Sequence, residues 1–200
     1  MANSGLKALV ARLESLAPTG ITTRSVQALM ADTPLDDREI ERFVVPRSDR
    51  YARQLVHRSP RFDVIVLTWM PGQSTPIHNH AGNLGWVQLV RGRIREDRYM
   101  LVPSCLDTGL DLAGEVEEPR KGIELREIGT TVVADRAAIA TVDRLRAIHR
   151  IGNPKEHLRD EMAVTLHVYS KPHDACLTFD PVTRTCSRRE MQFDSAVELA

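Results

Sequence analysis

Two histidines separated by one residue are the side chains of this sequence best suited to bind a metal. His78 and His80 lie in the segment 71–92. If this segment is a β-strand, both imidazoles leave by the same face, because alternate side chains of a strand point to the same side. Neutral imidazole is the commonest protein ligand for a transition metal. The pair therefore predicts half of a metal site.

The residues around the pair give it a recognisable frame. The spacing of Gly72, the two histidines, Gly85 and Gly92 resembles the first sequence motif of the cupin superfamily, which normally has glutamate at the place of Gly85. Further along, the segment 149–153 matches the His-x-x-x-Asn ending of the second cupin motif, although the Pro-x-Gly upstream of it is missing. Without this frame, the histidine pair could equally be a chance feature of a surface strand.

Further motifs resemble the landmarks of one cupin family, the cysteine dioxygenases. In chain order they are the segments 51–56, 67–69, 77–80, 148–153 and 165–170, followed by Phe179-Asp180 and Met191. Members of that family are non-haem iron enzymes that oxidise the thiol of cysteine to a sulfinate with O₂. The resemblance implies a mainly β, cupin-type barrel or jelly roll with a short N-terminal helical segment. It also implies a thiol dioxygenase acting on L-cysteine.

The resemblance implies a cofactor, Fe(II), held by His78, His80 and His149. With Gly85 in place of the cupin glutamate, the ion has three neutral ligands and no carboxylate. A thiolate is then a favourable further ligand, and the charge of the metal lowers the pKa of the thiol to supply it. We also expect the glycine to leave room for substrate. Three histidines suit zinc as well, so the choice of iron rests on the resemblance.

The resemblance assigns substrate binding to Arg53, with Tyr51 beside it. A guanidinium suits a carboxylate because its fork can donate two parallel hydrogen bonds. A related branch that acts on 3-mercaptopropionate has glutamine at this place, and a register slip of one residue would exchange Arg53 for Gln54. The spacing from Tyr51 to Arg53 argues against that slip. The alternative is that Arg53 lies on the surface of a strand and has no role in binding.

The catalytic residues that the resemblance implies are Thr165, His167 and Tyr169. A strand would line all three along one face. The family usually has Ser-His-Tyr here, and the tyrosine hydroxyl serves as a hydrogen-bond donor or acid. Animal members join this tyrosine covalently to a cysteine at the position of Gly85, so this chain resembles the bacterial type that lacks the crosslink. The alternative is a strand with one polar face turned to solvent.

The composition limits which binding partners and which cellular compartment we expect for this protein. Lysine plus arginine and aspartate plus glutamate number 27 each, so no net field attracts nucleic acid or an anionic membrane. Cys105, Cys176 and Cys186 form no C-x-x-C pair, and neither a signal peptide nor a membrane-spanning run is evident. We therefore expect a cytoplasmic monomer or small homo-oligomer whose partners are a small thiol and O₂, without nucleic acid or membrane.

The elements that must position these residues follow from hydrophobic periodicity. Helical spacing predicts three N-terminal helices, the second capped by Thr22 or Thr23 and the third by Thr33. Short β-branched and aromatic runs then predict strands at 51–57, 62–69, 84–90, 94–101, 123–128, 130–134, 145–151 and 162–170. We expect a loop at 109–122. The whole is predicted to be a single cupin domain over 1–200, with helices 1–45 packed on a barrel of 46–200.

Rival interpretations stay open. The same oxidation could act on another small thiol carboxylate, such as 3-mercaptopropionate or mercaptosuccinate, or the chain could be a cupin that binds a metal or ligand without turnover. The remaining histidines, His57, His157 and His173, are expected to be solvated rather than ligands. Trp69 and Met191 are expected to belong to a core, although their family counterparts lie near the pocket wall.

Overall fold

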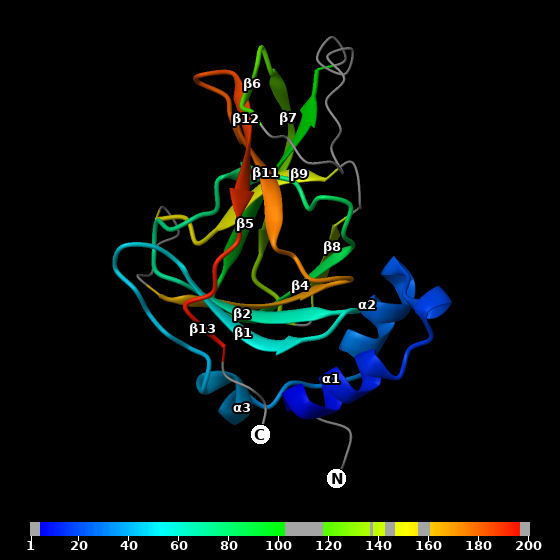
Figure 1. Ribbon diagram of the computed structural model, residues 1–200. Coiled ribbons are helices and arrows are strands. Elements are labelled where there is room, and N and C mark those ends of the chain that lie inside the picture. The colour runs from blue at the N-terminus through cyan, green and yellow to red at the C-terminus, as the bar shows by residue number, and fades with distance from the viewer. Residues whose placement is uncertain (1–4, 103–117, 137, 143–146, 156–160, 197–200) are drawn as a thin grey trace.

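The computed structural model describes residues 5–102, 118–136, 138–142, 147–155 and 161–196, which form two β-sheets and a set of N-terminal helices (Figure 1). Cys105, His157 and most of the loop predicted at 109–122 lie outside these residues. The fold is mainly β with a short helical N-terminus, as predicted. None of the helices in the described ranges has the length and apolar character needed to span a bilayer.

The N-terminal helices form where the sequence predicts them. They are α1 (Gly5–Glu14), α2 (Thr23–Ala31) and α3 (Asp37–Glu41), with a 3₁₀ turn at Pro18–Gly20. Thr22 and Ser25 form a reciprocal capping box at the start of α2. The predicted cap of the third helix is wrong, because Asp36 accepts the hydrogen bond from Arg38 N there. Thr33 instead donates its hydroxyl to the carbonyl of Leu29 at the end of α2.

One sheet has six strands in the order β13-β1-β2-β10-β4-β8. Their bounds are Ala52–Arg58 for β1, Asp63–Trp69 for β2, Gly85–Arg91 for β4, Ile139–Val142 for β8, Ala163–Tyr169 for β10 and Ser195–Ala196 for β13. The central strands β2 and β10 are buried along their whole length. Burial on both faces agrees with the apolar run 64–67 of β2, whereas β10 alternates apolar residues with Thr165, His167 and Tyr169.

The other sheet has seven strands in the order β6-β12-β11-β3-β9-β5-β7. Their bounds are Ile77–His78 for β3, Ile94–Leu101 for β5, Arg120–Lys121 for β6, Leu125–Val133 for β7, Ile148–Gly152 for β9, Ala175–Asp180 for β11 and Thr185–Glu190 for β12. The two strands predicted at 123–128 and 130–134 form one strand, β7, and Gly129 does not break it. Its ladder with β5 continues through Gly129, which pairs with Arg98, and shifts register directly beside it, between Arg98 and Tyr99.

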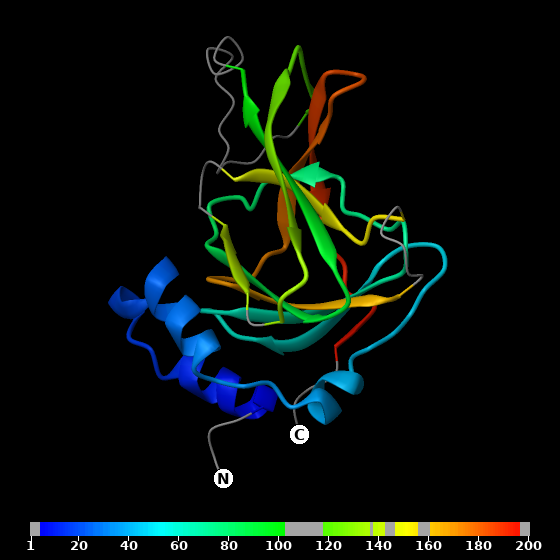
Figure 2. The same ribbon diagram turned by 180° about the vertical axis from the view of Figure 1, so that it is seen from behind.

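The helices cover the outer face of the six-stranded sheet, while the second sheet faces its inner side (Figures 1 and 2). Leu9, Val26 and Phe43 of the helical segment share one core with Val66 and Leu166 of β2 and β10. The alternate residues of the same strands point the other way, and this inner core also includes residues of β5 and β9. Side chains of opposite parity on β10 therefore serve different compartments, one under the helices and one inside the barrel.

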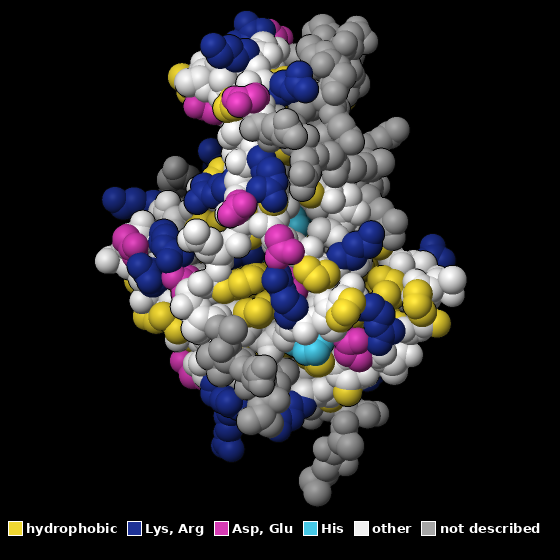
Figure 3. All heavy atoms as spheres, viewed as in Figure 1, with side chains coloured by type: hydrophobic (Ala, Val, Ile, Leu, Met, Phe, Trp, Pro, Cys, Tyr) yellow, Lys and Arg dark blue, Asp and Glu magenta, His cyan; other side chains and the backbone are white. Residues whose placement is uncertain are grey.

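The outer surface carries charges of both signs. Lysine and arginine side chains are interspersed with aspartate and glutamate over the face drawn in Figure 3. Several charged side chains of the outer surface form ion pairs, for example Arg91 with Glu41 at 2.6 Å. The mixture agrees with the equal numbers of basic and acidic residues in the sequence.

Candidate metal centre

Three histidines from separate parts of the chain meet inside the barrel. His78 on β3 and His149 on β9 are directly paired in the antiparallel ladder, and His80 follows β3 by two residues. Their ring centroids lie 4.8 to 5.1 Å apart. One nitrogen of each imidazole lies within 4.8 Å of those of the other two, and all three side chains are buried. The cluster that the sequence predicts is therefore assembled, with no carboxylate among the residues grouped there.

Neighbouring groups orient two of the three imidazoles. The Nδ1 atom of His78 lies 3.0 Å from the carbonyl oxygen of Pro76, and Nδ1 of His149 lies 2.6 Å from Oε1 of Glu96. A proton on Nδ1 is donated to these acceptors, so Nε2 keeps the lone pair that a metal needs. Nδ1 of His80 has no partner among the described residues. The sequence interpretation missed Glu96, because its contact depends on how β5 pairs with β9.

The electrostatic environment keeps His78 and His80 uncharged, which favours the binding of a cation. Burial, followed by the proximity of His149, lowers the pKa of His78 and of His80 well below the usual value for histidine. Both rings are therefore neutral at pH 7, the protonation state in which imidazole binds a metal. Three buried neutral imidazoles with converging nitrogens fit a transition-metal ion.

A small cavity of about 20 Å³ opens beside the histidines. Arg53, Tyr169, Cys176 and Met191 are among the side chains that line it, and none of the described lining residues is acidic. It adjoins an outer cavity of about 280 Å³, and the two share Tyr51, Arg53, Arg189 and Met191. The two cavities are therefore neighbours that meet at these four side chains.

Arg53 reaches this cavity from β1, and its guanidinium has no ion-pair partner among the described residues. The side chain is 5% exposed, and neither Nε nor one terminal nitrogen, Nη2, has a hydrogen-bond partner among the described residues. Its charged end lies 5.5 Å from the ring of Phe193. Gln54 points to the opposite side, where it accepts a hydrogen bond from Ser195. A buried guanidinium with idle donors is costly, so the arrangement calls for an anionic partner.

Four polar side chains form a continuous hydrogen-bonded chain along β2 and β10. Trp69 donates its indole N–H to the Thr165 hydroxyl at 2.9 Å, and that hydroxyl lies 2.9 Å from Nε2 of His167. Nδ1 of His167 lies 3.2 Å from the hydroxyl of Tyr169. Burial raises the pKa of Tyr169 to about 12, so its hydroxyl keeps its proton. Tyr51 stacks on Trp69 with ring centroids 4.7 Å apart.

Gly85 does not provide the room for substrate that we expected. It is paired with Tyr169 across β4 and β10, and a Cβ atom there would lie 3.4 Å from Cε1 of Tyr169 and 3.3 Å from Cβ of Val142. Those two side chains already fill the space beside the glycine. Gly85 therefore borders the edge of the tyrosine ring rather than the cavity.

His173 is the largest departure from the sequence prediction, since it is buried and not solvated. It is 1% exposed, and its ring stacks on Tyr169 with centroids 4.7 Å apart and an interplanar angle of 22°. Burial lowers its pKa to about 3. A histidine after Pro172 gives no sequence signal for this position. His57 is half-buried and lies 2.9 Å from Oε1 of Glu14.

Two sulfur-containing residues border the cavity. The thiol of Cys176 lies 3.6 Å from the sulfur of Met191, and burial raises the pKa of Cys176 to about 11. This thiol is therefore protonated at neutral pH and is not an activated nucleophile. Met191 lines the cavity, whereas Trp69 contributes its indole N–H to the hydrogen-bonded chain behind it.

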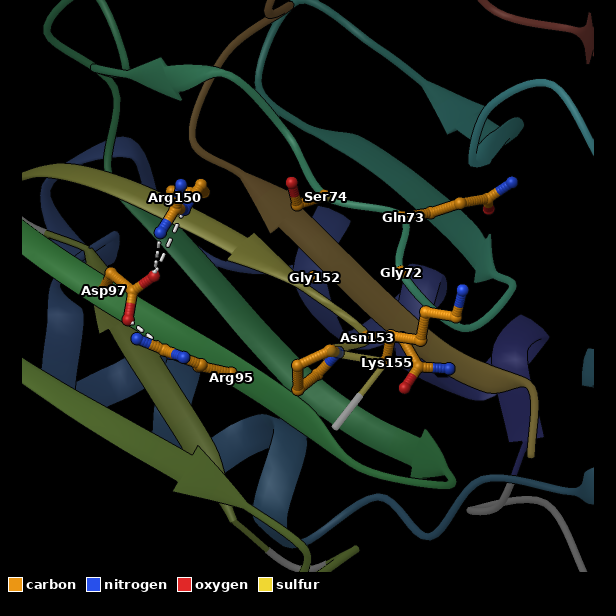
Figure 4. Close-up of a pocket in the computed structure, with 10 residues that line it drawn as sticks. Gly72, Gln73, Ser74, Arg95, Asp97, Arg150, Gly152, Asn153 and Lys155 are labelled. Atoms are coloured by element: carbon orange, nitrogen blue, oxygen red, sulfur yellow. Dashed lines mark hydrogen bonds and ion pairs between the residues drawn. The ribbon is translucent and has the colours of Figure 1, made fainter. Parts of the chain in front are cut away.

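A larger cavity of about 310 Å³ lies elsewhere, on the other face of β5 and β9 (Figure 4). Asp97 lies at its side and accepts hydrogen bonds from Arg95 and Arg150. Lys155 and the backbone near Gly72 also line it. None of the three clustered histidines lines this cavity, and it shares no lining residue with the cavity that contains Arg53. The volume of a cavity therefore does not indicate where the histidine cluster lies in this protein.

A barrel with three converging histidines in its interior defines a metal-binding protein of the cupin type. The family model for cysteine dioxygenase type I matches residues 2–182 of this sequence. The chain therefore belongs to the cysteine dioxygenase family.

Known proteins resemble the chain over most of its length. It is 27% identical over 174 residues to cysteine dioxygenase type 1 of Danio rerio, which covers 86% of this chain and 77% of the relative. It is 24% identical over 176 residues to cysteine dioxygenase type 1 of Homo sapiens, with 88% and 78% covered. The crystal structure of the protein TT1209 from Thermus thermophilus is similar with a TM-score of 0.42 and 17% identity, over 66% of this chain and 93% of that one.

Membership of this family identifies the general type of reaction that the protein catalyses. The protein is a dioxygenase enzyme, and its family uses a small-molecule substrate and O₂. Thiol oxidation holds at the level of the family, and the three-histidine cluster together with that membership indicates a bound metal.

Proposed function

We propose that this protein oxidises the thiol of L-cysteine to cysteine sulfinate with O₂ and that its metal is Fe(II). The observation that carries the proposal is a cluster of three buried imidazoles, two of which line a cavity that also contains a buried guanidinium and has no acidic lining residue among the described ones. His78, His80 and His149 hold the ion in this proposal. When bound, Fe(II) supplies a coordination site for the thiolate and the redox activity that O₂ requires.

Arg53 is proposed to bind the substrate carboxylate. Its idle nitrogens are donors that a carboxylate can accept in parallel, and such a charge-assisted pair is both strong and directional. The anion also compensates a buried positive charge that otherwise has no described counter-ion. Binding of the carboxylate therefore fixes the distance between the thiol and the three histidines. Tyr51 lines the same cavity as Arg53 and is proposed to form the cavity wall beside the bound substrate.

Tyr169 is proposed as the hydrogen-bond donor beside the reacting sulfur. Its raised pKa keeps the hydroxyl proton available, and it lines the same cavity as Arg53. His167 lies between Tyr169 and Thr165, so the chain of hydrogen bonds sets the direction of the tyrosine hydroxyl. The donor is thus aligned before the substrate arrives, which reduces the reorganisation needed during the reaction.

A second candidate substrate is a thiol with two carboxylates, such as mercaptosuccinate. The observation that favours it is Arg189, which lines both the inner and the outer cavity. The Arg189 side chain is exposed and has no described hydrogen bond or ion pair. It could therefore take a second carboxylate while Arg53 takes the first. With 3-mercaptopropionate, which has one carboxylate, this additional contact is absent.

Metal analysis combined with oxygen uptake tests the proposal. The purified enzyme is expected to contain iron, to consume O₂ when cysteine is added, and to release a sulfinate detected by mass spectrometry. The panel includes 3-mercaptopropionate and mercaptosuccinate, and His149→Ala is the control that should lose both the iron and the activity. Preference for mercaptosuccinate that disappears in Arg189→Gln supports the second candidate. A protein that binds iron but oxidises none of these thiols is a binding module, and the proposal fails.

A further inference from the structure

His173 occupies a buried position that its sequence context does not predict. It lies in the short connection between β10 and β11 and is held at two points. Its backbone N–H donates to Oδ2 of Asp63 at 2.8 Å, and the amide nitrogen of Asn83 lies 3.2 Å from its Nδ1. Since the amide nitrogen can only donate, Nδ1 accepts and the ring proton is on Nε2. Nε2 is buried and has no partner among the described residues.

The ring of His173 belongs to a group of three nearly parallel rings. It lies 4.7 Å from the ring of Tyr169 and 5.7 Å from that of His80, with interplanar angles of 22° and 21°. Tyr169 and His80 are themselves 5.8 Å apart at 28°. His173 is thus in contact with both a residue of the histidine cluster and the tyrosine that borders the cavity. The spacing matches that of offset-stacked aromatic pairs.

Apart from its contacts in the barrel core, the ring of Tyr169 is held at its hydroxyl and along one face. Its hydroxyl has a hydrogen bond to His167 at 3.2 Å, and the edge of the ring faces Gly85, which has no side chain to pack against it. A ring held at its hydroxyl can still rotate about its long axis. The face covered by His173 restricts that rotation, because a turned ring would collide with the stacked imidazole.

We propose that His173 is a positioning residue that fixes the ring of Tyr169 relative to His80 and thereby to the metal. This inference rests on the role proposed above for Tyr169. His173 acts through its aromatic face rather than through a proton transfer, since its ring contacts Tyr169 by stacking and its Nδ1 is already used by Asn83. A neutral aromatic residue can therefore replace it, whereas a residue of similar bulk without a ring cannot.

Steady-state kinetics of His173→Phe and His173→Leu test this distinction. Both variants fill the buried volume, but only phenylalanine keeps a flat ring. We expect His173→Leu to lower kcat about tenfold or more with a much smaller change in KM, because the position of a proton donor matters mainly in the transition state. His173→Phe should stay within about threefold of the wild type. His57→Leu, which alters a half-buried histidine outside the site, is the matched control and should not change kcat.

A double-mutant cycle shows whether the effect passes through Tyr169. In a Tyr169→Phe background the hydroxyl is gone, so His173→Leu should cause little further loss of kcat. Equal losses from His173→Leu with and without the tyrosine hydroxyl would overturn the proposal. Equal impairment of His173→Phe and His173→Leu would overturn it as well, since the ring would then be irrelevant.

Fluorine NMR gives a readout that does not depend on activity. The chain has three tyrosines, so 3-fluorotyrosine labelling yields few signals, and Tyr169→Phe assigns the one of interest. In the zinc-loaded wild type and in His173→Phe we expect a Tyr169 signal from a ring that does not flip on the NMR timescale. In His173→Leu the signal should broaden or average. An unaltered signal in His173→Leu refutes the positioning role even if no thiol substrate is found, so the two proposals fail separately.

Discussion

Arg53→Gln is the substitution whose effect can be worked out most fully. It removes the buried guanidinium but keeps a polar side chain at the same end of the cavity. A hydrogen bond to a charged group contributes about 1.5–3 kcal/mol, and about 1.4 kcal/mol is a factor of ten. We therefore expect kcat/KM for cysteine to fall by about 10- to 150-fold. Most of this should appear in KM, because the carboxylate is bound equally before and during the reaction.

Stability should change little in Arg53→Gln, in contrast to activity. The substitution removes a buried charge that has no described counter-ion, which favours the folded variant. It also removes the contact with the ring of Phe193, which for a buried guanidinium costs about 2 kcal/mol. The two effects oppose each other, so urea unfolding should show no loss greater than about 2 kcal/mol.

Two comparisons make the Arg53 test decisive. Cysteamine lacks the carboxylate, so wild type and Arg53→Gln should oxidise it at similar rates in an oxygen electrode. Arg61→Gln is the matched control, because that guanidinium binds Glu14 at 2.7 Å outside the site. It should lower stability and leave kcat/KM unchanged. An Arg53→Gln enzyme with unaltered KM for cysteine and reduced stability would show that Arg53 is structural, and the substrate model would have to be abandoned.

Three further predictions concern the surroundings of the site. Glu96→Ala should weaken metal binding in a chelator competition by about 10- to 100-fold, since the carboxylate orients His149, and an unchanged affinity would contradict this. Burial raises the pKa of Asp97, but hydrogen bonds from two guanidinium groups outweigh it and leave the pKa below its usual range. Asp97→Asn should therefore cost about 1–3 kcal/mol of unfolding free energy at pH 7. That difference should begin to shrink as the pH falls below about 4, the pKa of an unperturbed Asp, and should vanish once the pH is below the depressed pKa of the folded state, because protonation then removes the stabilisation. The pKa of Cys176, near 11, leaves about a thousandth of the thiol ionised at pH 8. Iodoacetamide should label it only after unfolding, as peptide mass mapping can check.

The sequence predicted the parts of the fold that depend on local pattern. The strand β2 carries an apolar run and β10 carries apolar residues at alternate positions, and their predicted ends differ from the observed ones by a single residue. The glycine frame is informative for a related reason. Gly72 and Gly92 have φ angles of 86° and 76°, a region that disfavours other residues. Backbone requirements of this kind leave a direct mark on the residue type.

Contacts that depend on tertiary packing could not be predicted from the residue types in this way. The strands β11 and β12 were not predicted, because alternation in Ala175–Asp180 is weak and Thr185–Glu190 is mostly polar. The partner of His149 is set by the pairing of β5 with β9, which no local pattern reveals. His173 was misjudged for the same reason, since its burial follows from Asn83 and Asp63 on distant segments. The residue types of the site were thus predictable, but their supporting contacts were not.

The adjacent acids of β5 face opposite sides of the sheet, Glu96 toward His149 and Asp97 toward Arg150. If β5 slipped by one residue against β9, the shorter acid would face the histidine and the longer one the arginine. Neither contact would then have its native length. The contact that orients His149 therefore depends on the alignment of these two strands, and so a metal bound by His149 is expected to stabilise the native register.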